Sequence, residues 1–210
     1  MKVLIKVIMI SAIGAFVYSA VSNQSSNNLK EQGQQVGMNI SANELDNYDH
    51  NFTLPINVLE EHKASKSQIY LNVVIPKIFH SIDDSDSLVF IPKTDKGVDT
   101  PEESILIKEF FFVSALEFMY ARQRFMLMTC PKVSILESKN KEYSNYSESS
   151  FMAIYASYNQ TSIVAEKYFS GPKSFFVIMY TIAISSSMTE EMAKQKIKDF
   201  TTNNIKIVKA

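Results

Sequence analysis

Three histidines and one cysteine carry the widest chemical range in this sequence: His50, His62, His80 and Cys130. A nucleophilic cysteine needs a histidine close to it in space, and a protein zinc site needs His or Cys pairs at short, regular spacing. No two histidines lie four residues apart, and there is no second cysteine. The sequence therefore predicts no metal site. We expect Cys130, between an apolar segment and Pro131, to be buried and inert.

Carboxylates cluster just after His80, at Asp83, Asp84 and Asp86. Oxygen ligands of this type bind hard cations, but the loop glycine and the bidentate glutamate of a calcium loop are missing here. The cluster is therefore interpreted as an acidic turn. The chain also has no G-x-S-x-G elbow and no Gly-rich phosphate loop. We predict no catalytic, cofactor-binding or metal-ligating residues, and a Ser-His-Asp arrangement assembled from distant residues stays open as the alternative.

The first 22 residues have the pattern of a secretory signal peptide. Lys2 and Lys6 precede an apolar stretch over 7–18, and small residues follow at 19–22, where cleavage is expected. That stretch is shorter than the roughly 20 apolar residues of a membrane-spanning helix. We expect an exported protein, periplasmic or extracellular, with no stable membrane anchor after cleavage.

Composition divides the remaining chain into two parts. Residues 23–51 are rich in Asn, Gln and Ser and poor in large apolar side chains, so they are predicted to form a flexible leader. Residues 52–210 are predicted to form one domain. The net charge of −1 does not favour nucleic-acid binding, and the chain is expected to be monomeric.

Within the domain the pattern predicts an α+β fold: an antiparallel sheet of six or seven strands with two packed helices. Helices are expected over about 112–129 and 189–201. In the first, a stripe with a single polar break at Gln123 is predicted to face the sheet; it runs through Phe112, Leu116, Met119, Tyr120, Gln123, Met126 and Leu127. Whether the helices cover one face of the sheet or both is left open by the sequence. The expected strands are 56–60, 68–75, 87–91, 105–110, 133–137, 151–158, 162–169, 175–185 and 205–208.

The end of the chain resembles a known family. A strand ending in Tyr168-Phe169, the turn Ser170-Gly171-Pro172, an apolar strand and a C-terminal helix follow in order. The short turn predicts an antiparallel hairpin. Over residues 150–210 this order resembles PsbP-like α/β domains, which include many small exported bacterial proteins. The resemblance implies a non-catalytic accessory or binding role.

The function predicted from the sequence is an exported, non-enzymatic binding or accessory module for a protein or a small ligand. Interaction with a host or with the cell envelope is one form that fits. The alternative is a secreted hydrolase with a dispersed active site. That alternative predicts His62 or His80 within hydrogen-bond reach of a serine, Cys130 or a carboxylate in a cleft.

Overall fold

The fold is described from a computed structural model. It describes residues 49–57, 69–84, 87–93, 101–111, 114–144, 146–157, 160–171 and 174–209. The predicted signal peptide and nearly all of the predicted leader lie outside these residues. The elements are β1 (His50–Asn57), β2 (Ile69–Ile75), β3 (Phe79–Asp84), β4 (Ser87–Pro92), β5 (Glu103–Phe111), α4 (Ala115–Thr129), β6 (Lys132–Glu142), β7 (Ser147–Ser157), β8 (Gln160–Ser170), β9 (Ser174–Ala183), α5 (Glu190–Asn203) and β10 (Ile205–Lys209).

Seven strands form one antiparallel sheet in the order β3-β4-β5-β9-β8-β7-β6. The predicted α+β class is confirmed, and the antiparallel sheet predicted to have six or seven strands has seven. A second sheet, β1-β2-β10, was not predicted as separate. Its central strand β2 pairs antiparallel with both neighbours, so β2 joins β1, at the start of the described chain, to the C-terminal strand β10.

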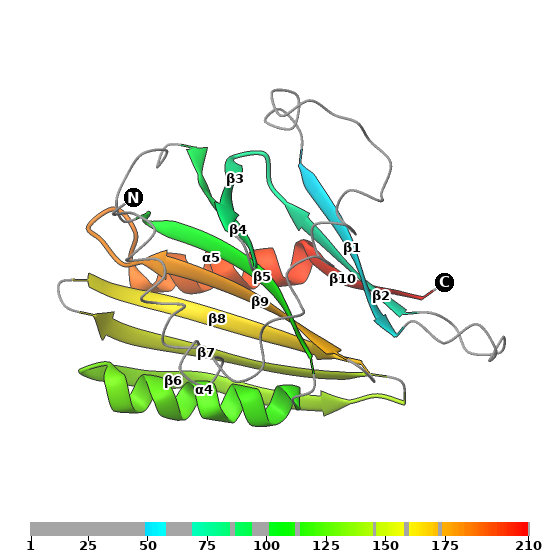
Figure 1. The fold of residues 1–210 in the computed structure, drawn as a ribbon. Helices are drawn as coiled ribbons and strands as arrows, with labels where there is room; N and C mark the ends of the chain where they lie inside the picture. Colours follow the sequence, from blue (N-terminus) through cyan, green and yellow to red (C-terminus); the bar gives the residue numbers. More distant parts are fainter. Residues whose placement is uncertain are drawn as a thin grey trace, which may run out of the picture.

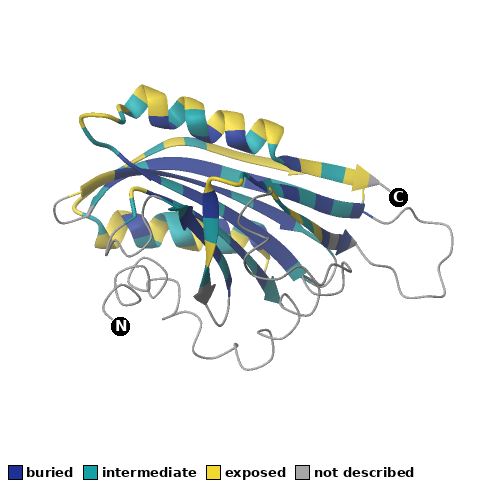
Figure 2. Ribbon diagram, turned by 90° about the horizontal axis from the view of Figure 1, so that it is seen from above, coloured by how far each residue is buried: buried dark blue, intermediate teal, exposed yellow. Residues whose placement is uncertain are grey.

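Both faces of the large sheet are covered, which answers the question that the sequence left open. Helix α5 and the small sheet lie over one face and share a large apolar core with it. Helix α4 lies along the other face, over β6, β7 and β8, with a second, smaller core. Figure 1 shows α4 along one side of the sheet and α5 behind it, and Figure 2 shows the strands between the two helices.

Burial along the strands follows from this layering. In β2 every second side chain is buried, because the described residues cover one face of the small sheet. In β9, at the centre of the large sheet, side chains of both faces are buried, from Phe175 and Phe176 to Ile182 and Ala183. The apolar run that predicted this strand therefore reflects coverage from both sides.

The predicted hairpin is present between β8 and β9, in antiparallel register from Ser162↔Ala183 to Ser170↔Phe175. Its turn is packed tightly against β1. A Cβ atom on Gly171 would lie 1.7 Å from the carbonyl oxygen of Ile56. Only glycine allows the two backbones to approach this closely.

Helix α5 begins with a polar cap. The side chain of Thr189 accepts a hydrogen bond from the Met192 amide at 3.3 Å. Ala193, Ile197 and Phe200 form its buried face, as the spacing predicts. Among the described residues, no helix is both long enough and apolar enough to cross a membrane.

Three strands differ from the prediction. Strand β3 was missed, because its sequence FHSIDD is short and largely polar. Strand β1 covers His50–Asn57 rather than 56–60; residues 58–60 lie outside the described chain. Strand β6 continues to Glu142 through residues predicted to be a loop. Because β6 is an edge strand with largely exposed side chains in this part, it needs no apolar pattern there.

Candidate functional site

Helix α4 starts at a local cap and ends before a proline. The hydroxyl of Ser114 accepts a hydrogen bond from the amide of Glu117 at 3.4 Å. At the other end the amide of Cys130 donates to Met126 O, and Pro131 follows. Ala115, Met119 and Met126 are the buried residues of the helix, four and seven positions apart. This spacing defines one face that packs on the sheet.

A charged residue lies in the middle of that buried face. Arg122 is three residues after Met119 and four before Met126, and its side chain is only 12% exposed. Its Nε donates to Oε1 of Glu166 on β8 at 3.0 Å. Glu166 is 1% exposed. The second carboxylate oxygen, Oε2, accepts a hydrogen bond from the hydroxyl of Tyr168, which is also fully buried.

The electrostatics of this cluster keep its groups in fixed protonation states. Burial alone lowers the pKa of Arg122, but the adjacent Glu166 carboxylate more than compensates and holds the pKa above its ordinary value. Burial and the same carboxylate raise the pKa of Tyr168 well above its usual range. Burial also raises the pKa of the neighbouring Tyr155. At neutral pH the guanidinium is therefore charged and both phenols are protonated.

This arrangement positions the helix rather than transferring protons. Both oxygens of Glu166 are already engaged by Arg122 and Tyr168, so neither is available as a general base in this geometry. A buried pair of this kind is strongly orientation-dependent, because displacing either partner leaves an uncompensated charge. The contact therefore fixes which face of α4 meets the sheet.

The rotation of α4 differs from the prediction for this reason. The predicted inner stripe contained Tyr120 and Leu127, but these side chains are 49% and 57% exposed. Relative to the predicted stripe, the buried face is turned by about a fifth of a turn, so that Arg122 reaches Glu166. Met128 is 84% exposed. A purely apolar packing rule orients the helix wrongly, because it cannot include a buried ion pair.

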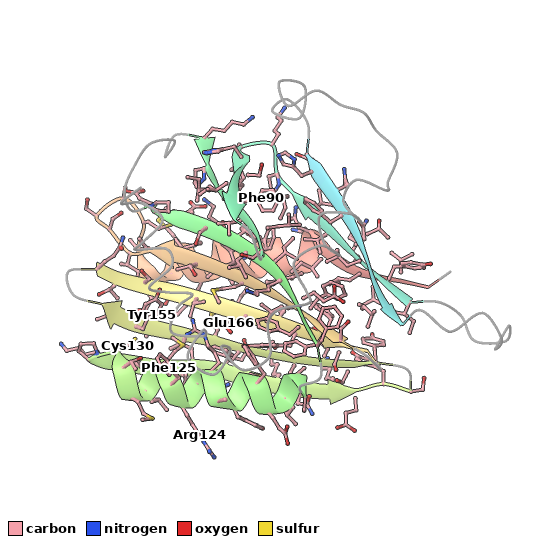
Figure 3. The ribbon with its side chains drawn as sticks, viewed as in Figure 1. Phe90, Arg124, Phe125, Cys130, Tyr155 and Glu166 are labelled. Atoms are coloured by element: carbon pink, nitrogen blue, oxygen red, sulfur yellow. The ribbon has the colours of Figure 1, made fainter. Side chains whose placement is uncertain are left out.

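The outer face of α4 is consequently a surface of mixed chemistry. It consists of the exposed residues Glu117, Tyr120, Ala121, Arg124, Leu127 and Met128. Figure 3 shows Arg124 pointing away from the sheet, whereas Glu166 lies on the sheet side of the helix. Leu136, at a bulge in the adjacent strand β6, is exposed as well. Exposed apolar residues gathered on one helix face are typical of a contact surface.

Two more buried carboxylates lie on the opposite face of the sheet. Glu103 on β5 accepts from the hydroxyl of Tyr180 at 2.9 Å and forms an ion pair with Lys196 of α5. Glu109, also on β5, accepts from the hydroxyl of Ser174 at 2.7 Å. Burial raises the pKa of Glu109, and the hydrogen bond from Ser174 offsets part of that rise. Glu103 therefore ties α5 to the sheet much as Glu166 ties α4.

Of the residues singled out from the sequence, the three whose side chains the structure describes, His50, His80 and Cys130, belong to different elements. His80 lies on β3, and its Nδ1 is buried without a hydrogen-bond partner among the described residues. His50, at the start of β1, packs its ring against Phe90 at a centroid distance of 5.5 Å. His62 and Asp86 fall outside the described residues. In the part of the chain described, no three His, Cys, Asp or Glu side chains are grouped to hold a metal ion.

Cys130 is half-buried rather than buried as predicted. It caps the end of α4, where the helix leaves the sheet and turns into β6, so its surroundings are only partly closed. Its side chain packs at the margin of the smaller core. Its sulfur lies 4.0 Å from the Thr129 hydroxyl, at the limit of a hydrogen bond. Among the described residues His80 forms no hydrogen bond with Cys130, which is one of the contacts that the hydrolase alternative allows.

The cluster around Arg122 was missed by sequence reasoning. Arg122 and Glu166 are 44 residues apart and belong to different elements. One sequence signal did exist: Glu166 alternates with Val164 and Tyr168 along its strand, and Arg122 lies between Met119 and Met126 at helical spacing. Charged residues at such positions are rarely buried unless they are paired.

No protein-family model matches the sequence, and no curated protein matches it. Solved structures are similar in fold. The Ran-binding protein Mog1p of Saccharomyces cerevisiae matches with a TM-score of 0.45 and 11% identity, over 75% of this chain and 95% of that chain. LpqN, involved in cell envelope biogenesis of Mycobacterium tuberculosis, matches with a TM-score of 0.41 and 12% identity, over 82% of this chain and 99% of that chain.

A cyanobacterial PsbP (CyanoP) from Synechocystis matches with a TM-score of 0.46 and 8% identity, over 73% of this chain and 99% of that chain. A PsbP structure is thus among the matches, as the resemblance of residues 150–210 predicted. At these scores and identities the similarities concern the fold alone.

Proposed function

We propose that this chain is an exported, non-enzymatic binding or accessory module that contacts a protein through the outer face of α4. The observation that carries the proposal is the exposure of Tyr120, Leu127 and Met128 on one helix. Burying one such apolar side chain is worth about 1.5–3 kcal/mol. Tyr120, Leu127 and Met128 do not contribute this burial free energy, because Arg122 occupies the inner face of the helix. Exposed apolar side chains that do not contribute to folding stability are typical of an interaction site.

The residue types on this surface also fit a protein partner. Tyrosine, methionine and arginine are enriched in protein–protein interfaces, and tyrosine and arginine often contribute most of the binding energy. Methionine adapts its shape to a partner with little strain. Tyr120, Arg124 and Met128 lie four residues apart, so they follow one side of the helix.

Site-specific photo-crosslinking tests the binding role. A photoreactive amino acid is placed at Tyr120 in cells that produce the protein, and at the exposed Gln195 of α5 in a matched control. Irradiation is expected to give a defined adduct from position 120 and none from position 195. Equal adducts from both positions, or no adduct from position 120, would contradict the proposal.

Export rests on the first 22 residues, whose charged start, apolar centre and small residues fit a signal peptide. The test is fractionation of a producing culture with mass spectrometry of the mature N-terminus. We expect the protein in the periplasm or the medium, with an N-terminus created by cleavage between residues 19 and 23. An intact Met1 on protein recovered only from the cytoplasm would refute export.

A further inference from the structure

The outer face of α4 carries two opposite charges at a regular spacing. Glu117 and Arg124 are both exposed, and they are seven residues apart on the same side of the helix. At a rise of about 1.5 Å per residue, their backbones are about 10 Å apart, and the structure forms no ion pair between them. Among the described residues neither is in an ion pair. Tyr120 and Ala121 lie midway between them.

From this pattern we propose that a second copy of this chain docks on the face, α4 against α4 in antiparallel orientation around a two-fold axis. In a two-fold interface, if residue i contacts residue j, then j also contacts i. An axis passing between positions 120 and 121 places Glu117 opposite Arg124 of the other copy, twice. The same axis places the large Tyr120 ring opposite the small Ala121, also twice. Charge and size are therefore complementary in a single register.

Other registers of the same helix pair lack this property. An axis through position 124 places the two Arg124 side chains against each other, and like charges at an interface are strongly unfavourable. In the proposed register Leu127 lies opposite Ser114 of the other copy. The exposed apolar residues Leu127 and Met128 then extend the contact beyond each charge pair, toward both ends of the interface.

The two other candidate occupants fit the charges less well. An acidic segment of a different protein satisfies Arg124 but meets the carboxylate of Glu117. An anionic membrane surface meets the same like charge, and it attracts clusters of basic residues rather than alternating ones. Only a partner with the reverse order of charges satisfies both residues, and a second copy in antiparallel orientation supplies that order.

The expected dimer is weak. A standard stable interface buries about 1,600 Å², and two helices of 15 residues in side-by-side contact bury less. We therefore expect a dissociation constant in the micromolar range or above, on the order of 10 µM to 1 mM. The dimer rests on the proposed function, because it assigns a second copy as the partner that binds the outer face of α4.

Analytical ultracentrifugation of the purified protein over a range of concentrations tests the dimer. Arg124→Glu or Glu117→Arg alone creates two like-charge contacts per dimer and is expected to weaken dimerisation about tenfold or more. The double reversal Glu117→Arg/Arg124→Glu restores the opposite charges and is expected to restore dimerisation to near the wild-type level. Lys198→Glu, an equal charge change at an exposed position of α5, is the control and should leave the dimer unchanged.

Circular dichroism of each variant verifies that the fold is intact, which is expected because both residues are exposed. Protein that stays monomeric up to millimolar concentration would overturn the dimer, as would a double reversal that fails to restore it. Failure of the dimer can be distinguished from failure of the proposed function. A monomeric purified protein that crosslinks from position 120 to a different protein keeps the docking surface and removes only the second copy.

Discussion

Arg122 on helix α4 donates a hydrogen bond through Nε to the buried carboxylate of Glu166 on strand β8, at 3.0 Å across the helix–sheet interface. The other carboxylate oxygen accepts a hydrogen bond from the hydroxyl of Tyr168, on the same strand. One charged contact thus determines how the helix is turned about its axis. It also determines which apolar residues, Tyr120, Leu127 and Met128, remain in solvent.

Removing the cation should be costly. Arg122→Met leaves Glu166 buried without its charge partner, and the expected loss in free energy of unfolding is about 3–5 kcal/mol. The matched control is Arg124→Met, two residues along the same helix and exposed, with an expected change within about 0.5 kcal/mol. Urea unfolding followed by circular dichroism measures both. Equal losses in the two variants would mean that the buried pair does not orient α4.

The hydrogen bond of Tyr180 to Glu103 should contribute to the attachment of α5. Tyr180→Phe removes a donor from a buried carboxylate, with an expected loss of about 1–3 kcal/mol. Tyr120→Phe removes an exposed hydroxyl and should change stability little. The comparison is made by thermal unfolding at neutral pH. A Tyr180→Phe variant as stable as Tyr120→Phe would show that Lys196 alone satisfies Glu103.

The sequence predicted those parts of the fold that depend on local pattern. The hairpin at Gly171 and helix α5 have strong turn and capping signals, and both are where they were expected. Strand β3 and the outer half of β6 lack such signals, because their side chains are polar. Polar segments at the edge of a sheet look like loops in sequence, although their backbones are paired on one side.

The candidate site depended on a contact that no local pattern encodes. Helix periodicity placed Tyr120 and Leu127 inside, because apolar spacing was the only available criterion. The competing interaction joins residues from two elements far apart in sequence. Its strength comes from burial, which is a property of the assembled fold. The orientation of α4 about its axis therefore could not be predicted from the sequence.

Substitution of Gly171 should disturb the contact between the β8–β9 turn and β1. In Gly171→Ala the new methyl group meets the carbonyl oxygen of Ile56 at 1.7 Å and its carbonyl carbon at 2.9 Å, so the backbone must shift. We expect a loss of about 1–3 kcal/mol or more. Ser170→Ala, one residue earlier, is the control with a small expected effect. Thermal unfolding that fails to separate the two variants would argue against this close approach.

Glu109 should make stability depend on pH. Burial raises its pKa in the folded state, so the folded protein binds its proton more tightly than the unfolded chain does. The contribution of Glu109 is fully present below the ordinary carboxyl pKa and is lost as the pH rises through the folded-state pKa. Glu109→Gln keeps an acceptor for Ser174 and removes this loss. The variant should therefore gain stability relative to wild type near neutral pH, and the gain should shrink in acid. Urea unfolding at several pH values measures the difference, and a pH-independent difference would contradict the assignment.

The orientation of α4 is tested most directly by the oxidation rates of its methionines in dilute hydrogen peroxide, resolved by tandem mass spectrometry. Met126 and Met128 are two residues apart and lie on opposite faces, with Met126 buried and Met128 84% exposed. Met192 on α5, 52% exposed, serves as an internal reference. With α4 in this orientation, Met128 should oxidise at least as fast as Met192, and Met126 should oxidise at least about tenfold more slowly than Met192. Rapid oxidation of Met126 with protection of Met128 in dilute protein would contradict it.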